Sequence, residues 1–230
     1  MITNGEFVSR VVNDINALTK DVHVSKRWIL SIGRTKAESY VVQRWDDGSM
    51  IEDGNLLTCV DCVRMIEVDK IDCCDAIFSL CGFLMRSEHR LPGIVFSTFG
   101  PLITKVSNVD NTIFYKYSNL EAYRNRVKRR YADKGSKYFY IHDGYLYIPD
   151  EHIELVNICY FTMKRREALR ISACKPGDEC ISEWDYDFIY PVKLIEYIVQ
   201  ETVKEVMNKV QIPTDENPNM DSNQKSQIVQ

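Results

Sequence analysis

Apolar residues near the start of the chain recur every three or four positions, which predicts an amphipathic helix over about residues 4–19. Thr3 and Glu6 have the spacing of a capping box at its start. A second helical series follows Ser25, which we expect to cap it, and Gly48 ends it. The two series together predict a helical hairpin over about residues 4–45.

The middle of the chain has a different pattern, with short runs rich in β-branched and aromatic residues separated by turn-forming residues. These runs predict antiparallel strands at about residues 58–68, 94–96, 102–106 and 112–117. Ser118 and Glu121 repeat the capping-box spacing and predict a helix over about residues 119–132. A further strand is predicted at about 153–161, so the β-rich region extends over about residues 56–162.

The strongest local signal is a pair of apolar and aromatic runs, 138–142 and 145–148, separated by Asp143-Gly144. This dipeptide predicts a two-residue type I′ turn, which fixes the pairing of the strands. One face then carries Phe139, Ile141, Leu146 and Ile148, and the other carries Tyr140, His142, Tyr145 and Tyr147. We expect the aliphatic face to be core. Because tyrosine is enriched at protein interfaces, we expect the tyrosine face to contact a neighbouring subunit, the alternatives being an exposed sheet face or a stacking platform for single-stranded nucleic acid.

Pro191 begins a last predicted helix, at about residues 191–210, whose apolar stripe runs from Leu194 to Val206. The polar residues 211–230 cannot bury enough apolar surface to order themselves, so we expect a flexible C-terminal tail. The fold class that follows is α+β: an N-terminal helical hairpin, an antiparallel β-rich middle with a tyrosine-rich hairpin, a C-terminal helix and a disordered tail. We expect residues 1–210 to form a single domain.

The formal net charge of −4 argues against a protein that coats nucleic acid, which would need an excess of Lys and Arg. The sequence has no signal-peptide pattern and no apolar run long enough to cross a membrane, so a soluble protein made in a cytoplasm is expected. The 8 cysteines are too irregularly spaced for a secreted disulfide scaffold and indicate reduced thiols.

Zinc is the alternative interpretation of the cysteines, because four thiolates at short spacing can hold it. The weak candidates are Cys59, Cys62, Cys73 and Cys74. The second pair is adjacent rather than spaced like a zinc knuckle, so no metal and no other cofactor is predicted.

Charge is unevenly distributed along the chain, with a basic segment at 116–137 and an acidic one at 178–187. The basic segment is a solvated face, a contact for DNA phosphates or a contact for an acidic protein surface. If the last holds, the acidic segment of the next copy is a fitting partner, as in a head-to-tail ring. The residues predicted for this contact are Arg126, Lys128, Arg129, Arg130, Asp178, Glu179, Glu183, Asp185 and Asp187.

No motif indicates an active site. Asp185 and Asp187 form a DxD pattern that is nearly unselective, and Asp143 beside His142 is explained by the turn. HExxH, G-x-S-x-G, Walker A and Rossmann patterns are absent from the sequence. An enzyme, and a small-molecule substrate, are therefore not expected.

Several stretches together resemble the neck ring, or head-to-tail connector, proteins of crAss-like podoviruses. They are residues 8–16, 21–27, 46–49, 85–87 with 91–92, 143–149, and 180 with 187–191. The resemblance extends over about residues 1–209.

The resemblance implies a virion ring, usually a dodecamer, that lies beneath the portal, joins the capsid vertex to the tail and lets double-stranded DNA pass. Its implied partners are copies of itself, the portal protein and adjacent neck or tail rings, with no membrane. It also implies that the tail docks on the portal and orders there, with Ile212, Met220, Ile228 and Val229 as its apolar contacts. The alternatives are a nucleic-acid-binding accessory protein that uses the basic segment, and a zinc-stabilised interaction module.

Overall fold

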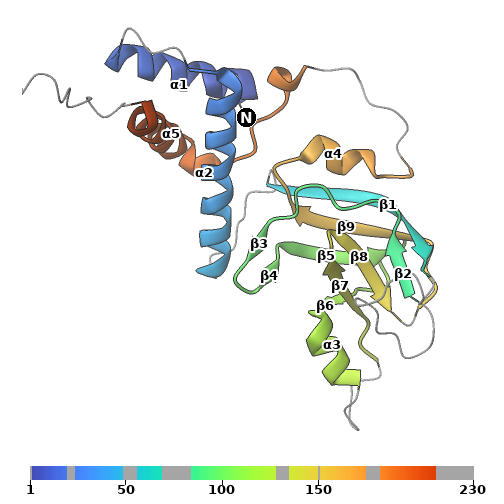
Figure 1. Ribbon diagram of the computed structural model, residues 1–230. Coiled ribbons are helices and arrows are strands. Elements are labelled where there is room, and N and C mark those ends of the chain that lie inside the picture. Colours follow the sequence, from blue (N-terminus) through green and yellow to red (C-terminus); the bar gives the residue numbers. More distant parts are fainter. Residues whose placement is uncertain are drawn as a thin grey trace, which may run out of the picture.

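The chain folds into a group of long helices beside a mixed β-sheet, as the computed structural model shows (Figure 1). The structure describes residues 2–19, 24–48, 56–68, 84–127, 135–149, 151–174 and 182–210. The helices are α1 (Asn4–Leu18), α2 (Lys26–Asp46), α3 (Leu120–Val127), α4 (Arg165–Arg170) and α5 (Ile195–Val210), with short 3-10 turns at Glu183–Asp185 and Val192–Leu194. The strands are β1 (Leu57–Glu67), β2 (Leu84–Ser87), β3 (Phe96–Ser97), β4 (Gly100–Pro101), β5 (Ile103–Asn108), β6 (Lys116–Tyr117), β7 (Tyr138–His142), β8 (Tyr145–Pro149) and β9 (Leu155–Phe161).

The capping box at the start of α1 is confirmed. The Thr3 hydroxyl accepts a hydrogen bond from the Glu6 backbone N–H at 3.1 Å, and the Glu6 carboxylate accepts one from the Thr3 N–H at 2.9 Å. Ser25 holds the N-cap position of α2, but its side chain makes no capping bond, so the prediction that it caps α2 is wrong in that respect. The capping box thus satisfies two N–H donors at the start of α1.

Helices α1, α2 and α5 share one apolar core, which joins the predicted hairpin to the predicted C-terminal helix. Phe7 lies at its centre, fully buried, and stacks on Phe188 with ring centroids 3.9 Å apart. Gly33 of α2 allows this approach, because a Cβ built there would lie 2.3 Å from the Phe7 ring. The segment before α5 therefore holds α1 and α2 together.

The described strands form a seven-stranded sheet in the order β5-β9-β1-β2-β8-β7-β6, and β3 and β4 form a separate hairpin. The tyrosine-rich hairpin is confirmed in its register, because Tyr140 pairs with Tyr147 and His142 with Tyr145. Asp143 and Gly144 adopt the positive φ values, 49° and 77°, that a type I′ turn requires.

Two expectations about the β-rich region are wrong in detail, and the position of β9 in the sheet was not predicted. Strand β6 pairs with β7 in parallel, so the sheet is mixed rather than antiparallel. Strand β9 lies between β1 and β5, away from the hairpin that precedes it. Asn119, rather than Ser118, caps α3, because its side chain accepts a hydrogen bond from the Ala122 N–H at 2.6 Å.

One segment, residues 113–118, contains β6, the outer strand at one edge of the sheet, and also pairs with β5 at the other edge. The Tyr115 N–H donates to Val106 of β5 at 2.9 Å, while the Ser118 N–H donates to Phe139 of β7 at 2.9 Å. The sheet thus curls until this segment joins its two edges, and Tyr115 points into the apolar interior that the curled sheet encloses.

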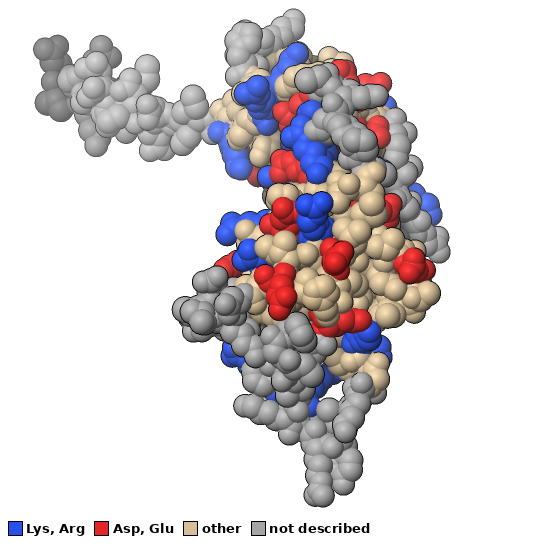
Figure 2. Space-filling view, turned by 90° about the vertical axis from the view of Figure 1, so that its right-hand side faces the viewer, with Lys and Arg blue, Asp and Glu red and all other residues tan. Residues whose placement is uncertain are grey.

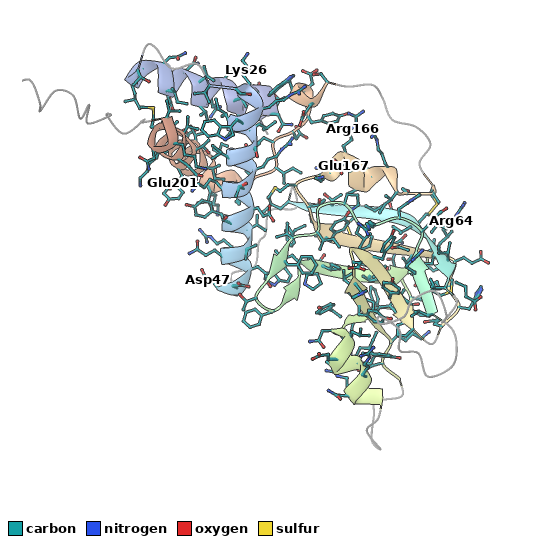
Figure 3. The ribbon with its side chains drawn as sticks, viewed as in Figure 1. Lys26, Asp47, Arg64, Arg166, Glu167 and Glu201 are labelled. Atoms are coloured by element: carbon teal, nitrogen blue, oxygen red, sulfur yellow. A yellow bond between two sulfur atoms is a disulfide. The ribbon has the colours of Figure 1, made fainter. Side chains whose placement is uncertain are left out.

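An apolar junction joins the helices to the sheet. Trp45, near the end of α2, packs edge-on against Phe161 of β9 with ring centroids 5.7 Å apart, and Val41 and Leu102 are buried beside them. The β3–β4 hairpin adds a hydrogen bond of 3.0 Å from Thr98 to Asp46, next to Asp47, which is labelled at the end of α2 in Figure 3. That residues 1–210 form one domain stays a prediction, and residues 211–230 lie outside the described residues.

Candidate subunit-contact surfaces

The tyrosine face of the hairpin is only partly a surface. Tyr140 is fully buried and Tyr147 is 3% exposed, and their rings stack with centroids 5.2 Å apart. Helix α3 covers them, since Leu120 packs on this cluster and the Tyr123 ring lies 6.3 Å from that of Tyr140. The prediction of an exposed tyrosine face is therefore wrong for Tyr140 and Tyr147, which are core residues of their own subunit.

Tyr145 and His142, on the same face, remain half-buried and accessible. The guanidinium groups of Arg86 and Arg90 lie 4.6 and 5.4 Å from the centre of the Tyr145 ring. His142 Nε2 lies 3.7 Å from the Asp143 carboxylate. That these residues contact a neighbouring subunit stays a prediction.

The basic segment is described in part, because Lys128, Arg129 and Arg130 lie outside the described residues. Arg126 is exposed on α3, donates to the Tyr138 hydroxyl at 3.0 Å and lies 5.2 Å from the centre of that ring. Lys116 Nζ lies 3.3 Å from the Ser136 hydroxyl. These contacts keep both cations at the end of the molecule formed by α3 and β6 (Figure 1).

Three polar side chains interact beside the basic segment, and the first contact is an ion pair between Lys137 and Glu151. The Glu151 carboxylate also accepts a hydrogen bond of 2.9 Å from the Tyr115 hydroxyl. Burial of Tyr115, together with the nearby carboxylate, raises the pKa of its hydroxyl above the usual value. Tyr115 is therefore neutral. Its hydrogen bond to Glu151, which also pairs with Lys137 of the sheet region, ties residues 113–118 to the neighbouring strands.

The acidic segment lies at the other end of the molecule. The 3-10 turn Glu183–Asp185, orange beside the N label in Figure 1, lies above the sheet, whereas α3 lies below it. Glu183 pairs with Arg34 of α2 at 3.1 Å, while Asp185 and Asp187 are exposed. Asp178 and Glu179 lie outside the described residues. The structure thus separates the predicted basic and acidic contacts.

Helix α4 supports the acidic segment from below. Figure 3 shows Arg166 extending from α4, and its guanidinium lies 5.0 Å from the centre of the Tyr186 ring. The Asn4 side chain fixes the other side by donating to the Glu183 carbonyl at 2.8 Å. Contacts from α1, α2 and α4 therefore hold a segment whose sequence alone indicates only a charged connection.

The prediction that the cysteines are reduced thiols is wrong for four of them. Among the described residues, Cys59 is bonded to Cys159 and Cys62 to Cys174. These four sulfurs are not the reduced thiols that the spacing suggested, and a disulfide-bonded sulfur is not the thiolate that zinc binds. Cys73 and Cys74 lie outside the described residues.

Sequence reasoning missed a group of exposed aromatic residues on the β3–β4 hairpin and on residues 113–118. Phe99 is 76% exposed, Phe114 56%, Phe96 55% and Tyr117 38%. The signal was present in the run Phe96-Ser-Thr-Phe99-Gly-Pro, because a hairpin this short cannot bury two aromatic side chains at its tip. The sequence analysis used these residues only to place strands and turns and did not infer that their aromatic side chains would be exposed.

Charge does not form a continuous basic face on the side of the molecule that Figure 2 shows. Lys and Arg are interspersed there with Asp, Glu and uncharged residues over the described part of the chain. In that part, no helix is long and apolar enough to cross a membrane, and no group of three or more His, Cys, Asp or Glu side chains has the arrangement of a metal site.

The family model described as phage tail ring protein 2 matches residues 6–225. The chain belongs to this family. The match confirms the resemblance to ring proteins of crAss-like phages and makes the chain a structural protein of the bacteriophage virion. A comparison with curated proteins gives no significant match.

Proposed function

We propose that copies of this tail ring protein form a dodecameric ring in the neck of the virion, which joins the portal at the capsid vertex to the tail and surrounds the channel for double-stranded DNA. The observation that carries the proposal is the family match over residues 6–225, nearly the whole chain. The role is structural and non-enzymatic.

The curled sheet supports side-chain contacts between copies rather than strand pairing. Residues 113–118, which carry the outer strand β6, also pair with part of β5 at the other edge, and this limits the backbone groups that another chain could bind. Basic and acidic surfaces at opposite ends of the subunit suit a heterologous contact, in which each copy presents one surface to the next and a rotation closes the ring.

The charge of the chain supports passage of DNA rather than its retention. A net charge of −4 repels phosphates overall, so a channel built from such subunits has little affinity for a duplex that moves through it. The DNA is a transient partner, and the portal and the adjacent rings are the stable ones.

Electron microscopy of the virion tests the ring. We expect density for the described fold in a closed ring between the portal and the tail, with the DNA channel on its axis. Mass measurement of the assembly formed by the purified chain, alone and with portal protein, should give the number of copies that electron microscopy shows in the ring. A location at the far end of the tail, or an open filament, would contradict the proposal.

The C-terminal segment 211–230 is the proposed contact with the portal, through Ile212, Met220, Ile228 and Val229. A chain that ends at Val210 should keep its thermal midpoint but lose at least about tenfold in portal affinity, because α5 is complete without the segment. The control replaces the same four apolar residues with Ser in a full-length chain and should lose affinity equally. Undiminished portal binding by either variant would eliminate this role.

A further inference from the structure

Two arginine side chains converge on one tyrosine of the β7–β8 hairpin. The Arg86 guanidinium lies 4.6 Å from the centre of the Tyr145 ring, and the Arg90 guanidinium lies 5.4 Å from the same centre. Arg86 belongs to β2, where it lies opposite Tyr147, and Arg90 follows the end of that strand. Arg86, Arg90 and Tyr145 are here called the arginine–tyrosine site.

Hydrogen bonds fix the backbone on which the site is built. The Leu91 N–H donates to the Gly144 carbonyl at 2.8 Å, and the Leu146 N–H donates to the Ser87 hydroxyl at 3.1 Å. The aliphatic part of Arg90 lies over the type I′ turn, because a Cβ built on Gly144 would lie 3.9 Å from three of its side-chain carbons. The segment that carries both arginines is therefore held against the hairpin.

The two guanidinium groups have no acceptor in the part of the chain that the structure describes. Neither group forms a hydrogen bond or an ion pair with a described residue, and the Nε–H of Arg86 is buried there without a partner. Two positive charges beside one ring repel each other, and a buried N–H without an acceptor is destabilising. An anion bound to both arginines would relieve both effects, so the geometry favours a negatively charged ligand.

Carboxylates at the margin of the site restrict the kind of anion that it takes. Glu88 lies between the two arginines in the chain and pairs at 3.9 Å with Arg64, which Figure 3 labels at the end of the sheet away from the long helices. Asp143, in the turn beneath Arg90, is exposed. A DNA duplex presents a continuous row of phosphates, which these two carboxylates repel. A single side-chain carboxylate can approach between them, and the planar guanidinium binds it through two hydrogen bonds.

We propose that the arginine–tyrosine site binds a side-chain carboxylate of an adjacent copy of this chain in the ring. The inference rests on the proposed function and names one contact of that ring. A second copy fits because each subunit of a ring touches others of its kind, and because the chain has 33 Asp and Glu residues against 29 Lys and Arg. Arginine and tyrosine are enriched among the residues that supply most of the affinity of an interface.

Removal of the two charges tests the site. Arg86→Gln with Arg90→Gln should raise the concentration for half-assembly at least about tenfold in native mass measurements, with portal protein present. Arg86→Lys with Arg90→Lys keeps the charge but loses the planar guanidinium, and should raise this concentration less. Arg90→Gln alone, at an exposed position, should keep the thermal midpoint and still weaken assembly. Arg27→Gln with Lys193→Gln makes the same charge change at exposed positions outside the site and should assemble normally.

Crosslinking identifies the partner. A photo-crosslinking phenylalanine analogue in place of Tyr145 should join an isotopically labelled copy to an unlabelled one when the two are mixed. Reversing the charge of the Asp or Glu nearest the crosslinked position should weaken assembly as much as the double Gln variant does. Crosslinks to portal protein or DNA instead, or normal assembly of the double Gln variant, would overturn the inference while leaving a ring intact. If the unaltered chain forms no ring, the proposed function fails and the inference with it.

Discussion

Replacing Tyr140 with Ala is expected to lower the free energy of unfolding of the subunit by about 3–5 kcal/mol. Tyr140 is fully buried between its strand partner Tyr147 and helix α3, so the substitution leaves a cavity that the stacked rings cannot close. Urea unfolding of the isolated chain, followed by circular dichroism, measures the loss directly. Tyr147→Ala should behave similarly, because the two rings share one site.

Tyr145→Ala is the matched control on the same face of the same hairpin. It removes only a half-exposed ring and two cation–π contacts, from Arg86 and Arg90, and should cost about 1 kcal/mol or less. If Tyr140→Ala kept the wild-type urea midpoint but abolished ring formation, the tyrosine face would be a subunit interface after all. The structure predicts the opposite order of effects.

Local structure was largely predictable, because neighbouring residues determine it. The type I′ turn at Asp143-Gly144 fixed the hairpin register, and the capping box fixed the start of α1. Both depend on hydrogen bonds or backbone angles within a few residues. Structure that depends on interactions between residues close together in the chain can therefore be predicted from the sequence.

Pairing between distant segments was not predictable. Strand β9 pairs with β1, and Cys159 lies opposite Cys59, 100 residues away in the chain. The cover of Tyr140 comes from α3, whose position depends on the strand order rather than on its own sequence. Alternation alone gives two faces of a hairpin but does not say which of them another element will cover.

The candidate contact surfaces show the same division. The charged segments were found from composition, and the structure places their described members at opposite ends of the subunit. The exposure of Phe96 and Phe99 required knowing that β3 and β4 are only two residues long. Exposure is a property of packing, so a Phe at a strand end looks the same in the sequence whether it is covered or not.

Breaking the Cys59–Cys159 bond is expected to lower the free energy of unfolding by about 2–5 kcal/mol. The bond joins residues 100 positions apart, and closing a loop of that length removes much of the freedom of the unfolded chain. Urea unfolding of Cys59→Ser, compared with the unaltered chain without reductant, measures the effect. Added reductant should destabilise the unaltered chain more than the variant.

The Cys62–Cys174 bond closes a loop that overlaps the loop closed by Cys59–Cys159. Breaking Cys62–Cys174 alone should therefore lower the free energy of unfolding by less than breaking Cys59–Cys159 does. Hydrogen bonds already hold the same site: the Cys62 N–H donates to Asn157 at 3.0 Å, and the Ala173 N–H donates to the Cys62 carbonyl at 3.0 Å. Alkylation of the denatured, unreduced protein should leave these four cysteines unmodified in peptide mass maps. Labelling of Cys59 and Cys159 in virion protein would show that the bond is absent from the assembled ring and that β1 and β9 are held by strand pairing alone.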